Sequence, residues 1–191
     1  MWNIYIYIKP NFQEPAGVRI AKALNDLLSK ESIKKYDYLL RVDADVILPL
    51  SFLETNLKLD ADYVGRAGYA MLLRVSAFIK FFGGRFPEIP AEDSYVGLKL
   101  IACGAGVKPY AIPPILKEKN DVAWWRKLIV RGKEAYKLGY EPLHILWLVL
   151  HDIKKIFILI GYFIALFMRL RRYDIYGFVF RAQLKRLLGV R

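Results

Sequence analysis

Apolar residues follow two spacings along the first 140 residues of the chain, one typical of strands and one typical of helices. Short runs rich in β-branched and aromatic residues predict strands, and they lie at residues 2–8, 36–42, 61–73 and 108–115. The third run is long enough for one or two strands. Helical spacing recurs at residues 18–29, 49–57, 75–82, 92–104 and 123–138. This alternation predicts an α/β sheet domain, and we place its end near residue 140.

The chain after residue 140 is more apolar than the part before it. Residues 143–150 are apolar, and residues 156–168 contain no charged side chain. A helix over the second stretch is roughly 20 Å long, short of the roughly 30 Å hydrocarbon core of a bilayer. Its apolar residues surround the axis, unlike those of a simple surface helix. We therefore predict that residues 141–191 form membrane-associating helices. The alternative is a buried helix in the core of an oligomer.

Charge supports the lipid interpretation. The 191 residues are 55% hydrophobic and carry a formal net charge of +12. A chain that is both apolar and basic is typical of proteins on anionic membrane surfaces, although nucleic acid is a rival partner. Seven basic residues and one acid fall between residues 169 and 191, directly after the most apolar segment, and residues 175–190 form a basic amphipathic stretch. No zinc-finger spacing or RNA-binding signature is present, so we expect no nucleic-acid partner.

The compartment is indicated by cysteine usage and by the first residues. Cys103 is the single cysteine, so no intrachain disulfide can form, which suits a reducing compartment. Residues 1–8 lack the basic start and the cleavage site of a signal peptide. We therefore expect the protein at the cytoplasmic face of a membrane.

Two carboxylates, Asp43 and Asp45, follow the strand predicted at residues 36–42. If the strand continues through them, their side chains point to the same side of the sheet. Hard divalent cations prefer oxygen ligands, and a metal held in this way can clamp a diphosphate. The pair therefore predicts a site for Mg²⁺ or Mn²⁺. An ordinary Asp-rich turn is the alternative interpretation.

A second acidic pair, Glu92 and Asp93, begins the helix predicted at residues 92–104. A carboxylate here could take a proton from an attacking hydroxyl, although acids in a first helical turn are also common partners of the helix dipole. Upstream, Gly83 and Gly84 let the backbone turn tightly and approach a ligand. Their alternative role is to end the preceding helix, and both roles can hold at once.

Taken in order, four motifs resemble the glycosyltransferase family 2 domain, which has a GT-A fold and uses nucleotide-diphospho-sugars. They are Ala21-Lys22-Ala23-Leu24-Asn25, Asp43-Ala44-Asp45 followed by Pro49, Gly83-Gly84-Arg85-Phe86-Pro87-Glu88, and Glu92-Asp93 leading to Leu98-Lys99-Leu100 and Gly104. The resemblance covers roughly residues 1–140. The apolar helices that follow, with Gly161-Tyr162 inside them, are similar to those of membrane-associated members.

The resemblance implies a partial GT-A-like fold, with helices that flank a mixed sheet, and a metal-dependent, inverting transfer of a sugar to an acceptor. The acceptor would be a glycan or a lipid-linked molecule at the membrane face. Asp93 would be the catalytic base, and Glu92 would help to orient the acceptor. Asp45 would hold the metal together with Asp43, which would also lie near the ribose. Gly84 would lie in the loop beside the sugar and the acceptor.

This chain also departs from the pattern of the family. Members usually carry a further strand-helix-strand unit before the region that matches residues 2–8, and many have a histidine where this chain has Lys117-Glu118-Lys119. We therefore consider that a partner subunit supplies the missing unit. A second hypothesis is a non-catalytic, membrane-anchored partner of a glycosyltransferase. A third is a basic nucleic-acid binder.

Overall fold

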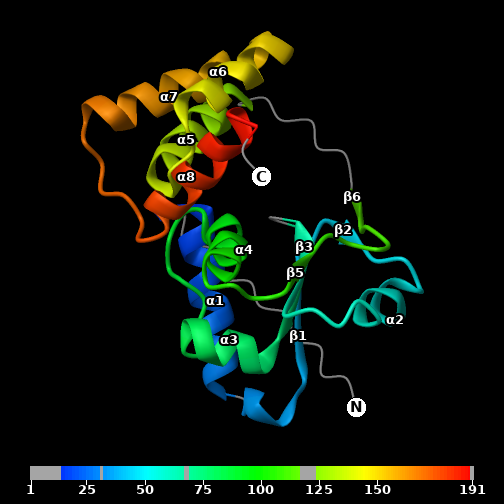
Figure 1. The fold of residues 1–191 in the computed structure, drawn as a ribbon. Helices are drawn as coiled ribbons and strands as arrows, with labels where there is room; N and C mark the ends of the chain where they lie inside the picture. Colours follow the sequence, from blue (N-terminus) through cyan, green and yellow to red (C-terminus); the bar gives the residue numbers. More distant parts are fainter. Residues whose placement is uncertain (1–13, 31, 67–68, 117–123, 190–191) are drawn as a thin grey trace. The chain divides into compact units, whose positions relative to one another are not determined.

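The computed structural model shows a mixed α/β protein (Figure 1) and describes residues 14–30, 32–66, 69–116 and 124–189. The strand predicted at residues 2–8 lies outside the described residues. The chain divides into two compact units, Met1–Glu118 and Lys119–Arg191. The sequence places the end of the sheet domain near residue 140, whereas this division comes earlier. The helix predicted at residues 123–138 thus joins the C-terminal helices, because its main packing partner is there.

The first unit is built on a four-stranded mixed sheet. Its strands, in spatial order, are β1 (Tyr38–Val42), β4 (Ala70–Arg74), β3 (Tyr63–Arg66) and β5 (Val107–Lys108). β4 runs antiparallel to both of its neighbours, and β3 pairs in parallel with β5. A second, two-stranded sheet joins β2 (Val46–Ile47) to β6 (Ile115–Leu116). The predicted α/β class with a mixed sheet is therefore confirmed.

The strands predicted at residues 61–73 and 108–115 differ in how well they match the structure. The run at residues 61–73 forms two strands, β3 and β4, as the sequence allowed. The short strand predicted at residues 108–115, broken by prolines, is strand only at its two ends, because β5 ends at Lys108 and β6 begins at Ile115 in the other sheet. Pro109, Pro113 and Pro114 separate them, and a proline cannot donate to a strand ladder.

Four helices and one 3₁₀ turn accompany the sheets. They are α1 (Ala16–Lys30), η1 (Ile33–Lys35), α2 (Phe52–Leu57), α3 (Val75–Phe82) and α4 (Glu92–Ala102). Figure 1 shows α1, α3 and α4 on one side of the four-stranded sheet and α2 on the other. α2 begins at Phe52, later than the predicted start at residue 49. Pro49 precedes the helix, and its carbonyl accepts a hydrogen bond from the Phe52 amide.

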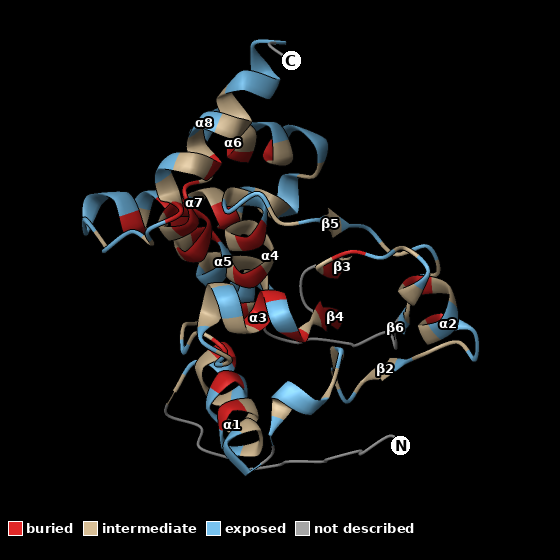
Figure 2. Ribbon diagram, turned by 60° about the horizontal axis from the view of Figure 1, so that its bottom comes forward, coloured by how far each residue is buried: buried red, intermediate tan, exposed pale blue. Residues whose placement is uncertain are grey.

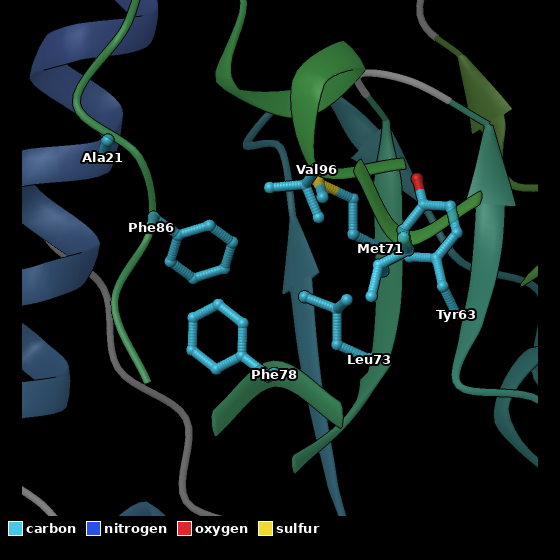
Figure 3. Packing of buried hydrophobic residues seen from close by; sticks show 8 residues of the cluster. Ala21, Tyr63, Met71, Leu73, Phe78, Phe86 and Val96 are labelled. Atoms are coloured by element: carbon cyan, nitrogen blue, oxygen red, sulfur yellow. The ribbon is translucent and has the colours of Figure 1, made fainter. Parts of the chain in front are cut away.

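β4 is buried on both faces because it is a central strand with helices on each side. Met71 and Leu73 belong to a cluster on the side of α1, α3 and α4, which Figure 3 shows around the rings of Phe78 and Phe86. Leu72 points the other way and packs in a cluster with partly buried residues of α2. β1 and α4 both contribute residues to the first of these clusters, so one core positions both elements.

The second unit is helical. Its helices are α5 (Trp124–Leu138), α6 (Pro142–His151), α7 (Ile156–Phe167) and α8 (Tyr176–Leu187), with a 3₁₀ turn, η2 (Ile153–Lys155), between α6 and α7. Its core includes Tyr136, Ile145, Ile158 and Tyr162. Figure 2 shows buried bands beside exposed ones along these helices. Among the described residues, no helix combines the length and apolar character needed to cross a bilayer.

Two glycines let α5 and α7 approach closely. A Cβ atom at Gly132 would overlap the backbone carbonyl oxygen of Ile158, and one at Gly161 would overlap that of Ile129. The contact is therefore backbone against backbone from both sides. At such a crossing any larger residue must push the helices apart.

Candidate functional site

The predicted acidic pair lies where β1 ends and a tight turn begins. The Asp43 amide donates to the carbonyl of Tyr69 at 3.0 Å, and the Asp43 carbonyl accepts from the Val46 amide at 3.0 Å. Asp45 lies in the turn, and both carboxylates are half-buried. The predicted strand ends at Val42, so the turn rather than strand alternation brings the two side chains together. The strand does not continue through the pair, so the turn interpretation describes the backbone here.

Arg41 joins this turn to the start of α4. Its Nη2 atom lies 3.1 Å from Oδ1 of Asp43, and its Nη1 atom lies 3.0 Å from Oε1 of Glu92. The side chains of Arg41 and Glu92 are 6% and 4% exposed, so this second ion pair is internal. Two motifs far apart in the sequence are thus connected through one guanidinium group.

Sequence reasoning missed Arg41, although a signal was present. Arg41 is a charged residue inside the otherwise apolar strand Tyr38–Val42. A buried charge is costly unless it is paired and hydrogen-bonded, so its position on a buried strand implies acidic partners. Asp43, two residues further along the chain, is one such partner. The other, Glu92, had no local signal.

Burial and repulsion between neighbouring carboxylates shift the pKa values of the acids at this site. Burial raises the pKa of Glu92 to about 7, against the opposing charge of Arg41, and the Asp93 charge raises it further. Burial also raises the pKa of Asp43, Arg41 lowers it, and the charges of Asp45 and Asp93 raise it. The four acids therefore form one electrostatic cluster, and a cation that enters it would favour their ionised forms.

Asp93 occupies the first turn of α4 and is half-buried. Its Oδ1 atom accepts a hydrogen bond from the Ser94 amide at 2.6 Å. The residue before α4, Ala91, has no side chain that could cap the helix, so Asp93 bonds one of the amides at the helix start. Asp93 thus takes the dipole role considered from the sequence, in a position that also keeps its charge next to Glu92 and Asp43.

The two glycines of the third motif end α3. Gly83 has φ +64° and its amide donates to the carbonyl of Ile79 at 2.9 Å, while the Gly84 amide reaches that of Phe78 at 3.4 Å. Gly84 has φ +75°, a conformation that side chains disfavour. The helix-ending role is therefore confirmed, and the predicted approach to a ligand stays a prediction.

Asn25 holds the loop that follows these glycines. Its amide nitrogen donates to the carbonyl of Phe86 at 3.0 Å and to Oε1 of Glu88 at 3.3 Å, and its oxygen accepts from the Phe86 amide at 2.7 Å. Ala21, one turn earlier, is fully buried, and a Cβ atom at Gly17 would overlap Glu92. The buried face of α1 thus receives both the glycine loop and the start of α4.

A buried tyrosine hydroxyl lies close to the same cluster. Tyr63 on β3 is 2% exposed, and its hydroxyl finds no hydrogen-bond partner among the residues that the structure describes. Burial raises its pKa, and the charges of Tyr110 and Asp93 act in the same direction. A tyrosine in an apolar strand gives no sequence signal for this position, because such residues are common in strands.

The acidic cluster offers few ligands to a divalent metal. In the described part of the chain, no group of three or more His, Cys, Asp or Glu side chains could hold a metal ion. Mg²⁺, however, is usually bound through only one or two carboxylates together with substrate phosphates and water. Asp43 and Asp45 fit that mode, in which the metal arrives with a diphosphate. Residues 117–119, where the resembled family often has a histidine, lie outside the described residues.

Comparison with known proteins adds no relative. A scan against protein-family models found no match to this chain, and neither did searches of curated proteins and of solved structures. The acidic cluster and the order of the motifs are therefore the features that bear on function.

Proposed function

We propose that the first unit is a GT-A-like domain that transfers a sugar from a nucleotide-diphospho-sugar to an acceptor hydroxyl, on a glycan or a lipid-linked molecule. One observation carries this proposal. Arg41 bonds both Asp43 and Glu92, so the Asp-x-Asp motif and the Glu-Asp motif meet in one acidic cluster. A transferase of this kind needs a metal site for the donor beside a base for the acceptor.

The donor side of the site is formed by Asp43 and Asp45. When bound, Mg²⁺ or Mn²⁺ supplies positive charge against the diphosphate that leaves the sugar. Asp45 is a metal ligand in this proposal, and Asp43 shares that role and faces the ribose. Because burial raises the pKa of Asp43, a proton competes with the cation for this carboxylate.

The acceptor side of the site is formed by the start of α4. Asp93 is the base that takes the proton of the acceptor hydroxyl as it attacks the sugar. Glu92 is buried against Arg41, so its contribution to acceptor orientation passes through the position of Asp93, its neighbour in the first turn of α4. Gly84 lies in the loop beside the sugar in this proposal, at a positive φ that glycine tolerates.

A second candidate function has an observation in its favour. The Arg41–Asp43 ion pair shows that Asp43 already has an internal partner, which is compatible with a purely structural role. In that case the chain is a non-catalytic, membrane-anchored partner of a transferase, and donor binding is supplied by another subunit. Metal-dependent donor binding by the purified chain separates the two functions.

The first test measures binding of a panel of nucleotide-diphospho-sugars to the full chain by calorimetry, with and without Mn²⁺. We expect Mn²⁺-dependent binding that Asp45→Asn abolishes. The matched control is Asp26→Asn, an exposed substitution of the same chemistry on α1, which should leave binding unchanged. Absence of binding by the wild-type chain would favour the non-catalytic partner, and equal binding by Asp45→Asn would remove the acidic pair from the site.

The second test separates binding from chemistry. Asp93→Asn should keep Mn²⁺-dependent donor binding and lose release of the nucleoside diphosphate, because the amide cannot accept the proton. The readout is nucleoside diphosphate formed over time beside the calorimetric affinity. Full turnover by this variant would exclude Asp93 as the base while leaving the donor site intact.

A further inference from the structure

Helix α6 is apolar on two opposite faces. Ile145 and Val149 are buried in the second unit. Leu143, Leu146, Trp147 and Leu150 are 59%, 43%, 50% and 77% exposed. Their spacing of three, four and seven residues places these four side chains on one face of the helix, opposite the buried pair. One face of α6 therefore packs on protein and the other presents an apolar surface.

Helix α7 repeats this arrangement. Ile158, Gly161, Tyr162 and Ala165 are buried. Ile156, Ile160, Phe163 and Phe167 recur at helical spacing on the other face and are about two-fifths exposed, rising to 81% at Phe167. Figure 2 shows exposed stretches on both α6 and α7. Two consecutive helices of one unit thus carry exposed apolar faces, far more than the scattered exposed residues of an ordinary surface.

Basic side chains flank these faces in the sequence. Lys154 and Lys155 lie in η2, between the two helices, and Arg169, Arg171 and Arg172 follow α7 directly. Lys154 and the three arginines are exposed. The Nζ atom of Lys155 lies 3.8 Å from Oδ2 of Asp152. Apolar residues bordered by cations match the headgroup region of an anionic leaflet, where acyl chains lie just beneath phosphates.

We propose that the exposed faces of α6 and α7, which we term the docking face, insert into the headgroup and acyl boundary of one leaflet of an anionic membrane. With twelve residues, α7 is about 18 Å long, which is too short to cross the roughly 30 Å core. A helix that lies in the interface needs no such length, because it inserts only roughly 5–10 Å. The buried faces of both helices stay on the protein while the docking face enters lipid.

A second copy of the chain is the competing occupant of this face. The net charge of +12 makes association of two like surfaces unfavourable, whereas the same charge draws the protein to acidic lipids. The proposal goes beyond sugar transfer, since it depends on the second unit alone and would hold for a non-catalytic partner as well.

The test is sedimentation of the full chain with vesicles of phosphatidylcholine alone or mixed with phosphatidylserine. The docking variant carries glutamate in place of Leu146, Leu150, Phe163 and Phe167. The matched control carries glutamate in place of Ile20, Ile47, Leu50 and Ile101, which are exposed apolar residues of the first unit. Both variants change the net charge equally, so a difference between them reports the place of the substitution.

We expect the wild-type chain and the control to bind the mixed vesicles, and the docking variant to bind at least tenfold more weakly. Equal binding by the two variants would overturn the proposal. So would a docking variant that becomes monomeric by light scattering while its vesicle affinity is unchanged, since a second copy would then be the occupant.

A measurement without charged substitutions guards against misfolding of the docking variant. Trp147 lies on the docking face, and the other tryptophans, at positions 2, 124 and 125, can be replaced by phenylalanine. The fluorescence of the remaining indole should be quenched by lipids brominated near the headgroup, and less by lipids brominated at the chain ends. An indole that no brominated lipid quenches would overturn the proposal.

Discussion

At the residue scale, the first unit depends on one guanidinium group. Arg41 reaches Asp43 and Glu92 at 3.1 Å and 3.0 Å from a buried position on β1. Taking one member from such a pair leaves a charge in the interior, which is more costly than the net gain of forming the pair. Arg41 therefore positions the acidic cluster, and its removal should affect both stability and donor binding.

We predict that Arg41→Met destabilises the protein by about 3 kcal/mol in urea unfolding at pH 8, the lower end of the range for breaking a buried pair. The lower end is expected because Glu92, whose pKa is already raised to about 7, can take up a proton. The double variant Arg41→Met, Glu92→Gln should regain part of the lost stability, since the buried charge of Glu92 is then gone while the half-buried Asp43 still lacks its partner. A double variant no more stable than Arg41→Met would contradict this account.

Glu92 should also make stability depend on pH with a definite sign. Its pKa is about 7 in the folded protein against an ordinary value of 4.5, because burial outweighs the attraction of Arg41. Between these values the folded state binds more protons than the unfolded state, so wild-type stability falls as pH rises through the window.

The prediction is tested with Glu92→Gln, which cannot ionise. The difference in Tm, variant minus wild type, should increase from about pH 4.5 to 7 and then level off. The exposed substitution Glu54→Gln is the control, and its difference should stay flat above pH 5, because the pKa of Glu54 is lowered. A flat profile for Glu92→Gln would show that Glu92 is ionised throughout.

At the element scale, local patterns predicted an element correctly where the signals for its ends lie in or beside that element. The helix predicted at residues 75–82 is α3, whose end at Gly83 follows from the positive φ that glycine tolerates. The sequence failed where pairing is not local. Residues 108–115 were predicted as one strand broken by prolines, yet their two ends join different sheets, which no spacing along the chain could indicate.

The candidate site divides in the same way. Asp43, Asp45 and Asp93 could be selected from short motifs, because each follows or begins a predicted element. The contact of Arg41 with Glu92 could not, since it joins β1 to α4 across the core. The hydrogen bonds of Asn25 with Phe86 were likewise hidden, although an asparagine on the apolar face of α1 is unusual.

The contact between α5 and α7 supports a prediction about elements. Gly161→Ala should destabilise the protein by about 1–3 kcal/mol, because the new Cβ atom overlaps the carbonyl oxygen of Ile129 and the backbones must separate. Gly177→Ala in α8 is the matched control, since no atom lies within 4 Å of its new Cβ atom. This control should raise stability by about 0.5–1 kcal/mol through reduced chain entropy. Denaturant unfolding of both variants measures the two effects, and equal effects would contradict the close contact.

At the scale of the whole molecule, the two units have separate cores. The clusters around Leu73 and Leu72 draw on residues of the first unit, and the cluster around Tyr162 draws on residues of the second. Chemistry and surface character divide in the same way, with the acidic cluster in the first unit and the docking face in the second. Such a division suggests that each unit unfolds as a cooperative block.

Calorimetry of the full chain can test this division with one variant in each core. Asn25→Ala leaves the amide and carbonyl of Phe86 without their partner, at a cost of about 1–3 kcal/mol, in the first unit alone. Gly161→Ala acts in the second unit alone. We expect two transitions in the wild-type chain, of which each variant lowers one and leaves the other within about 1 °C.

Adding Mn²⁺ with a bound nucleotide-sugar should raise only the transition that Asn25→Ala lowers, because a ligand stabilises the unit that holds its site. A single transition lowered by both variants would show that the two units unfold together. In that case a rise in Tm on adding the ligand would not indicate which unit holds the site.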